Sequence, residues 1–147
     1  MLKRGHQMSL PLPDSNAEYG THHYWEQRYA VEESYDWITS YAQVAELIAG
    51  AGVKKEDRIL IVGCGNSPFS AAMYDDGYHN IVNIDYSAVV IEREKAKWAR
   101  CENMQYLCMD MTNLEFDHGT SFSGVAADIV EISSPHCYGL TSYCVFL

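Results

Sequence analysis

The stretch Arg58-Ile-Leu-Ile-Val-Gly-Cys-Gly-Asn-Ser-Pro68 runs from an apolar strand through a Gly-x-Gly turn into the start of a helix. Gly63 and Gly65 let the backbone turn sharply and approach a ligand without a Cβ atom in the way. The next two residues can cap a helix, and Pro68 suits its first turn because a proline there loses no helical hydrogen bond. The stretch predicts a nucleotide-type cofactor site, with a tight structural turn as the alternative.

An acidic residue follows at the end of the next apolar segment. Residues 80–85 form a second expected strand, which ends at Asp85, 22 residues past Gly63 (85 minus 63). In a βαβ unit, an acid at about this separation accepts hydrogen bonds from ribose hydroxyls. Asp85 is therefore a candidate cofactor ligand.

A second acid follows a third expected strand. Asp110 comes directly after residues 104–109 and lies 25 residues past Asp85 (110 minus 85). At this position its carboxylate can accept from an adenine amino group while Met111 packs on the ring. Taken alone, Asp110 could equally be a turn or cap residue before Thr112. The repeated spacing favours contact with the ligand.

Strands and helices alternate through the middle of the chain. We expect strands at 58–62, 80–85, 104–109 and 125–132 and helices at 67–75 and 87–99. This alternation predicts an α/β, Rossmann-like fold with a mostly parallel sheet and flanking helices. The sheet is expected to be incomplete, because residues 133–147 offer no amphipathic helix and few further strands.

The chain divides into four expected regions. Residues 1–20 are polar, contain proline and have no period, so we expect disorder there. Residues 21–52 combine an aromatic lid with a helix that places Trp37, Tyr41, Val44 and Ile48 on one face. Residues 53–132 form the cofactor-binding core, and residues 133–147 an atypical tail.

Composition limits the kind of protein. The chain of 147 residues suits one domain, and its 48% hydrophobic fraction is typical of soluble globular proteins. No apolar run is long enough to span a membrane, and the N-terminal segment is too short and rich in proline for a signal peptide. We therefore expect a cytoplasmic protein with no membrane partner.

Cysteine content and charge exclude further classes. The five cysteines are odd in number and form no C-x-x-C pair, so we expect neither a disulfide framework nor a metal site. A net charge of −10 argues against nucleic acid as a partner and suits a basic protein surface as substrate.

The residues around the turn favour one cofactor over others. A full dinucleotide fingerprint requires a third small residue where this chain has Pro68, and no tyrosine has a lysine four residues later. A phosphate-binding loop ending in Gly-Lys-Ser or Gly-Lys-Thr is also absent. S-adenosylmethionine requires close backbone approach, a ribose acid and an adenine acid, which the turn, Asp85 and Asp110 supply. Aromatic side chains from residues 24–37 can stabilise its sulfonium charge.

Several motifs together resemble one family. Tyr24-Trp-Glu-Gln-Arg-Tyr29, Tyr35-Asp-Trp37, the glycine turn and Asn83-Ile-Asp-Tyr-Ser87 are similar to the small seven-β-strand S-adenosylmethionine-dependent methyltransferases that include the lysine methyltransferases of elongation factor 1-alpha. The resemblance covers residues 24–117. It implies methylation of a lysine in a protein substrate, for which elongation factor 1-alpha is a candidate. It does not specify the oligomeric state.

The resemblance also implies which residues contact the cofactor. These are Trp25, Tyr29, Trp37, Gly63, Gly65, Asp85, Tyr86, Asp110 and Met111. For the three residues Trp25, Tyr29 and Trp37, a hydrophobic lid that only packs on the sheet is the alternative. No catalytic residue is assigned.

The resemblance ends after the fourth expected strand. Where this family continues with Glu-Lys-Gly-Thr-Leu-Asp, the chain reads Val130-Glu-Ile-Ser-Ser-Pro135. The sequence therefore leaves three hypotheses: a protein-lysine methyltransferase, a truncated isoform that binds cofactor or partners without catalysis, and a nicotinamide-dependent oxidoreductase.

Overall fold

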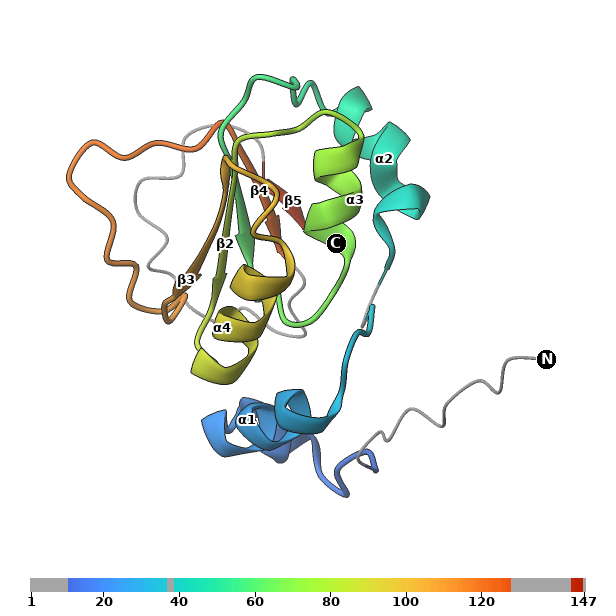
Figure 1. Ribbon diagram of the computed structural model, residues 1–147, viewed down its shortest axis with the longest axis vertical. Helices are drawn as coiled ribbons and strands as arrows, with labels where there is room; N and C mark the ends of the chain where they lie inside the picture. Colours follow the sequence, from blue (N-terminus) through green and yellow to red (C-terminus); the bar gives the residue numbers. More distant parts are fainter. Residues whose placement is uncertain (1–10, 37–38, 128–143, 147) are drawn as a thin grey trace.

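A parallel five-stranded sheet forms the centre of the computed structural model, which describes residues 11–36, 39–127 and 144–146. Its strands are β1 (Ile59–Val62), β2 (Ile81–Asp85), β3 (Met104–Cys108), β4 (Gly124–Ala127) and β5 (Cys144–Phe146). They lie in the order β3-β2-β1-β4-β5, and each neighbouring pair is parallel (Figure 1). The Rossmann-like α/β prediction is confirmed.

Four α-helices and one 3-10 helix accompany the sheet. They are η1 (Asn16–Gly20), α1 (His22–Val31), α2 (Tyr41–Gly50), α3 (Phe69–Asp75) and α4 (Ala88–Lys97). α3 connects β1 to β2, and α4 connects β2 to β3. α2 packs against α3, and α1 packs against α4 at the end of the molecule drawn lowest in Figure 1. In the described part of the chain, no helix is long and apolar enough to cross a membrane.

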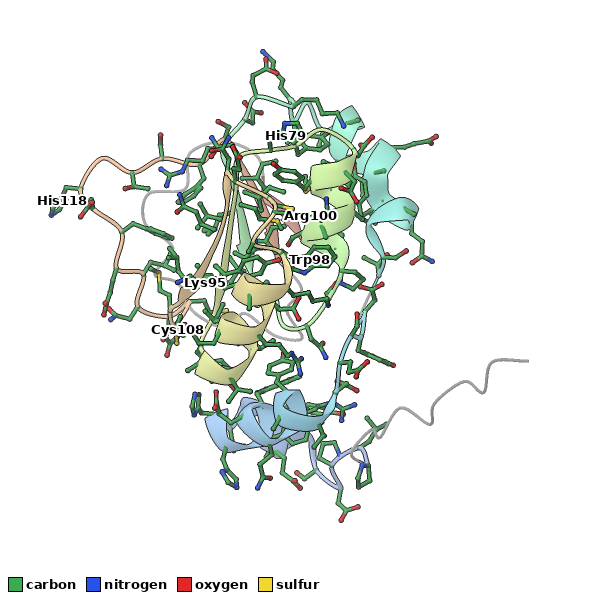
Figure 2. All side chains as sticks on the ribbon, viewed as in Figure 1. His79, Lys95, Trp98, Arg100, Cys108 and His118 are labelled. Carbon is green, nitrogen blue, oxygen red and sulfur yellow. The ribbon has the colours of Figure 1, made fainter. Side chains whose placement is uncertain are left out.

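β1 and β2 are buried on both faces, which explains the continuous apolar sequence of β1. Alternate side chains point to opposite faces, so Ile59 and Ile61 join one core cluster while Leu60 and Val62 join another. All four α-helices contribute buried side chains to the first cluster. The second face is covered by residues 107–122, which run from the end of β3 along an irregular path toward β4. Figure 2 shows His118 on the outer bend of this segment, away from the helices.

Serine residues cap the starts of α4 and α2. Ser87 caps α4, as predicted, by accepting a hydrogen bond from the Val90 N–H at 3.3 Å. α2 begins at Tyr41, where Ser40 and Gln43 form a capping box. Because Trp37 lies outside the described residues, its predicted contact with the cofactor has no structural description.

Two parts of the chain differ from the sequence expectation. Disorder was expected for residues 1–20, but Asn16–Gly20 form η1, which Ser15 caps. The Trp25 indole Nε1 donates to the Tyr19 carbonyl at 2.7 Å and ties η1 to α1. The tail contributes β5, which pairs with β4 and which the sequence did not predict. A three-residue strand held by backbone pairing leaves little side-chain period to detect.

Neighbouring positions on α2 test the packing of this helix. Ile48 is 2% exposed in the first core cluster, whereas Leu47 is 59% exposed. We expect Ile48→Ala to lower the free energy of unfolding by about 2–5 kcal/mol, because it removes buried methyl groups and leaves a cavity. Leu47→Ala is the matched control and should change it by less than about 0.5 kcal/mol. Urea denaturation measures both, and equal losses would show that α2 is not packed as described.

Candidate functional site

The turn after β1 has the geometry that its glycines predict. Gly63 and Gly65 have φ angles of +66° and +48°. This left-handed backbone is unfavourable for residues with a Cβ atom. The chain can therefore reverse direction at the carboxyl edge of the sheet, where ligands bind in open α/β folds.

Asp85 lies directly against this turn. Its carboxylate accepts one hydrogen bond from the Gly65 N–H and one from the Ser87 N–H, both at 2.9 Å. The residue is 5% exposed, and burial raises the pKa of its carboxyl group while the two N–H donors lower it. The structure thus brings together the turn and the first predicted acid, although Gly65 and Asp85 are 20 residues apart in the sequence.

Tyr29 covers the turn from the side of α1. A Cβ atom added at Gly65 would lie 2.7 Å from the Tyr29 hydroxyl oxygen, so a larger residue at this position would displace the Tyr29 side chain. Trp25, one helical turn earlier, stacks on Tyr29 with 5.5 Å between the ring centroids. Two of the three predicted lid aromatics therefore lie together, and one of them touches the turn.

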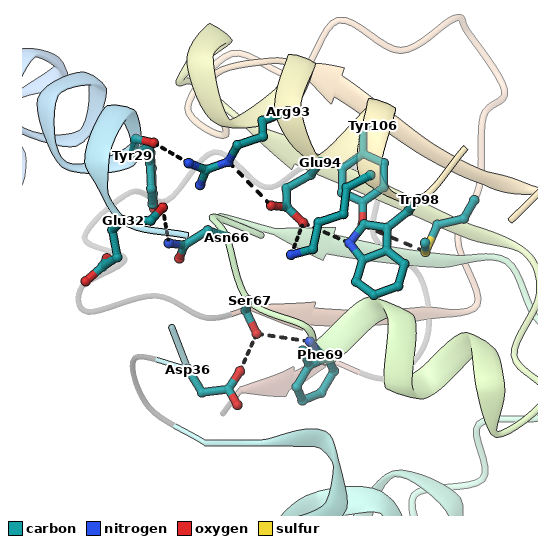
Figure 3. Close-up of polar contacts among 12 residues, drawn as sticks. Tyr29, Glu32, Asp36, Asn66, Ser67, Phe69, Arg93, Glu94, Trp98 and Tyr106 are labelled. Carbon is teal, nitrogen blue, oxygen red and sulfur yellow. Dashed lines mark hydrogen bonds and ion pairs between the residues drawn. The ribbon is translucent and has the colours of Figure 1, made fainter. Parts of the chain in front are cut away.

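Figure 3 shows three of the polar contacts that attach the lid, which we define as residues 22–36, to the core. The Arg93 guanidinium on α4 donates to the Tyr29 carbonyl at 2.6 Å. Asn66 Nδ2 donates to the Glu32 carbonyl at 3.2 Å, and Ser67 Oγ donates to Asp36 Oδ1 at 2.5 Å. The residues immediately after the glycine turn therefore hold two successive points of the lid.

A buried ion pair stiffens the lid itself. Arg28 and Glu32, one helical turn apart, form hydrogen bonds of 3.0 and 3.1 Å, and both side chains are almost fully buried. The Tyr24 hydroxyl accepts a further hydrogen bond from Arg28 at 2.8 Å. The sequence analysis missed this pair, although its i, i+4 spacing is a signal that could have found it.

Tyr86 also meets the lid. The His22 Nε2 atom lies 3.1 Å from the Tyr86 carbonyl oxygen, and the two rings meet edge to face at 5.0 Å. Burial raises the pKa of Tyr86 to about 12, with contributions from the charges of Asp85 and Asp110, so its phenol is neutral at physiological pH. His22 had no predicted role, because a histidine in a polar segment carries no recognisable spacing.

Asp110 and Met111 reach the same edge of the sheet but face other partners. Asp110 is exposed, and its Oδ1 accepts from the Thr112 N–H at 2.8 Å and the Thr112 hydroxyl at 2.7 Å. This is the turn geometry that the sequence analysis left as the alternative to adenine contact. Met111 packs with the cluster on the second face of the sheet.

The described residues do not form a cluster of metal ligands. Across residues 11–36, 39–127 and 144–146, no group of three or more His, Cys, Asp or Glu side chains could hold a metal ion. The features that suit a ligand are instead the glycine turn, the acid beside it and the aromatic cover.

A family comparison agrees with this geometry. Residues 59–138, more than half of the chain, match the family described as "Methyltransferase domain". At the level of this family, the match confirms the prediction of S-adenosylmethionine as the cofactor. The residues present fit such a ligand, because Gly63 and Gly65 lack Cβ atoms and a buried acid lies next to the turn.

Several curated proteins are similar in sequence. Over 112 residues, 74% of the chain, it is 39% identical to the eEF1A lysine and N-terminal methyltransferase of Mus musculus. It is 34% identical over 112 residues to EEF1A lysine methyltransferase 4 of Mus musculus. The matches cover 16% and 44% of those proteins, so the chain spans less than half of each relative's length.

Solved structures are similar in fold alone. The crystal structure of the cyclase SpnF superposes with a TM-score of 0.52 at 18% identity, covering 81% of this chain and 51% of that chain. The 23S rRNA methyltransferase ErmE superposes with a TM-score of 0.50 at 12% identity, covering 63% and 36%.

The contact between Gly65 and Tyr29 can be tested by mutation. We expect Gly65→Ala to destabilise the chain in two ways, by the left-handed backbone, about 1–2 kcal/mol, and by the clash with the Tyr29 hydroxyl. Gly119→Ala is the control, because Gly119 has a φ angle of +91° and no atom within 4 Å of its added Cβ. Urea denaturation should show the larger loss at Gly65.

A double variant separates the two causes. Combining Gly65→Ala with Tyr29→Phe removes the clashing hydroxyl and should recover part of the loss. If the loss of stability in the double variant equals the sum of the losses in the two single variants, Tyr29 does not lie on the turn.

Proposed function

Because this chain belongs to the methyltransferase domain family, we propose that it is an S-adenosylmethionine-dependent methyltransferase acting on lysine amines of a protein substrate. The observation that carries the proposal is the contact between Asp85 and the glycine turn, with 2.9 Å between the carboxylate and the Gly65 nitrogen. In this proposal Asp85 is the ribose acceptor, and it lies beside a glycine backbone that a ligand can approach closely.

The chain's own residues supply binding and orientation. In our proposal, Asp85 accepts from the ribose hydroxyls, and Gly63 and Gly65 permit close backbone approach. Tyr29 lies over the turn and Trp25 stacks on Tyr29, so that in this proposal the aromatic faces stabilise a sulfonium charge. Tyr86, held against His22, borders the ribose side.

Fewer observed contacts support the adenine end of the proposed site and the role of Trp37. Asp110 and Met111 follow β3, next to the strand that ends at Asp85. For Asp110 to accept from an adenine amino group, its carboxylate must share or exchange the hydrogen bonds it forms with Thr112. Trp37 is proposed as a further aromatic contact on the basis of the family resemblance alone.

The proposed reaction needs a neutral amine close to the cofactor. When bound, S-adenosylmethionine supplies an electrophilic methyl group, which the amine nitrogen attacks as the carbon–sulfur bond breaks and its electron pair stays on sulfur. The lid excludes water above the turn, and a desolvated site favours the neutral form of a lysine amine. None of the described residues is assigned as a general base.

The proposed substrate is elongation factor 1-alpha or a similar protein. The similar mouse proteins are named for lysine methylation of this factor, and the net charge of −10 suits a basic protein surface. A protein of the translation apparatus as substrate supports a cytoplasmic location.

A second candidate is a chain that binds cofactor without catalysis. One observation favours it: in the described part of the chain, residues 107–122 and not helices cover the second face of the sheet. The family match favours both candidates over the nicotinamide-dependent oxidoreductase.

Methyl transfer can be measured directly. We expect purified chain, incubated with S-adenosylmethionine carrying a labelled methyl group and with elongation factor 1-alpha, to label lysine residues of that protein. The control omits the chain, and peptide mass spectrometry identifies the modified residue. Measurable cofactor binding with no transfer to protein would favour the second candidate.

The ribose role of Asp85 predicts a loss of affinity on mutation. Asp85→Ala should weaken binding of S-adenosylhomocysteine by about 1–3 kcal/mol, because the ribose hydroxyls lose a buried acceptor. Asp75→Ala is a suitable control, because Asp75 is an exposed acid at the end of α3, paired only loosely with Arg100 at 3.5 Å. Calorimetric titration measures both, and an unchanged affinity in Asp85→Ala would remove the ribose role.

The raised pKa of Asp85 adds a pH dependence with opposite signs for binding and stability. Ribose hydroxyls donate to the ionised acid, so cofactor affinity should fall as the pH decreases through the raised pKa. In the ligand-free chain, a raised carboxyl pKa contributes stability below the unfolded value of 3.8, and this stability is lost as the pH rises through the folded pKa. Both trends should be weaker in Asp85→Asn, measured by calorimetry and urea denaturation.

A further inference from the structure

Asn66 carries a buried hydrogen-bond acceptor that the chain itself leaves unused. The residue follows Gly65 directly and is 0% exposed. Its Nδ2 donates to the Glu32 carbonyl at 3.2 Å, and because a carbonyl only accepts, this bond fixes the orientation of the amide. The Oδ1 atom is then shielded from solvent and has no hydrogen-bond partner among the described residues.

We therefore expect the Asn66 Oδ1 atom to accept a hydrogen bond from a donor outside the chain. Buried side-chain oxygens in folded proteins are almost always paired, because an oxygen without water or a donor is unfavourable. The backbone donors of the two neighbouring residues are already engaged, since the Gly65 N–H donates to Asp85 and the Ser67 N–H donates to the Cys64 carbonyl. A ligand enclosed by the lid can supply the missing donor.

The strand order indicates which part of the ligand lies there. Asp110 follows β3, Asp85 ends β2 and Asn66 follows β1, and these strands are neighbours in that order. With the adenine at Asp110 and the ribose at Asp85, the next part of S-adenosylmethionine along the same edge is its amino-acid part. That part carries one charged donor, the α-ammonium, and one acceptor, the carboxylate.

We propose that Asn66 Oδ1 accepts a hydrogen bond from the α-ammonium group of the cofactor, an inference that rests on the function proposed above. Only the ammonium has hydrogens to donate, so an amide oxygen distinguishes it from the carboxylate. The two ends of one side chain then have separate tasks: Nδ2 holds the lid at Glu32, and Oδ1 holds the ligand beneath it.

Ligand analogues and three variants test this assignment. The two ligands are S-adenosylhomocysteine and its deaminated analogue, which keeps the carboxylate but lacks the α-ammonium. In calorimetric titrations we expect Asn66→Ala to weaken the binding of S-adenosylhomocysteine by about tenfold or more. The same substitution should weaken the binding of the analogue by less than about threefold. Asn66→Asp keeps an oxygen acceptor and should therefore keep the preference for S-adenosylhomocysteine.

Ser67→Ala is the matched control for a merely structural effect. It removes the neighbouring lid contact to Asp36 and should weaken both ligands to the same degree. Equal weakening of both ligands by Asn66→Ala as well would overturn the assignment.

Two further outcomes are decisive. If circular dichroism shows that Asn66→Ala does not fold, the affinities of the wild-type chain for the two ligands test the proposal. Equal affinity for the deaminated analogue and S-adenosylhomocysteine would contradict it. If the wild-type chain binds neither ligand, the proposed function fails, and this inference fails with it.

Discussion

The Asp85 carboxylate joins three parts of the fold that are far apart in sequence. It accepts from the Gly65 N–H in the turn after β1 and from the Ser87 N–H at the start of α4, while the residue itself ends β2. Each oxygen therefore fixes one backbone segment at the carboxyl edge of the sheet. The two bonds partly compensate for burying a charged group, since charge-assisted hydrogen bonds are among the stronger ones in proteins.

The position of the lid follows from this arrangement. With the turn held against Asp85, the backbone of Gly65 lies under the Tyr29 ring, and the next two residues reach the lid at Glu32 and Asp36. Arg93 adds a contact from α4, the helix whose N-cap residue, Ser87, donates to Asp85. Hydrogen bonds therefore join the turn to the second strand on one side and to the lid on the other.

Much of this edge could be predicted from the sequence, because its signals are local. A left-handed turn needs glycine, Ser87 is a good N-cap residue, and an acid at the end of β2 follows the length of one βα unit. The contacts that attach the lid could not be predicted in this way. Arg93 reads as part of a solvated charge run, and Asn66 as a helix cap. Only the three-dimensional placement of α1 gives these side chains their partners.

The second face of the sheet shows the same limit. Residues 107–122 have no helical or strand period, yet Phe116 and Phe122 pack together with 5.1 Å between their ring centroids and cover β1 and β2. Similarly, β5 is defined by its backbone pairing with β4, for which three residues provide no pattern. Irregular segments are placed by the surfaces they bury, and those surfaces exist only after the sheet has formed.

The most direct test of the central claim is calorimetric titration of the wild-type chain with S-adenosylhomocysteine and, separately, with NAD. A site built from the glycine turn and Asp85 for S-adenosylmethionine should bind S-adenosylhomocysteine with one-to-one stoichiometry and show no comparable heat with NAD. Binding of NAD alone would contradict it.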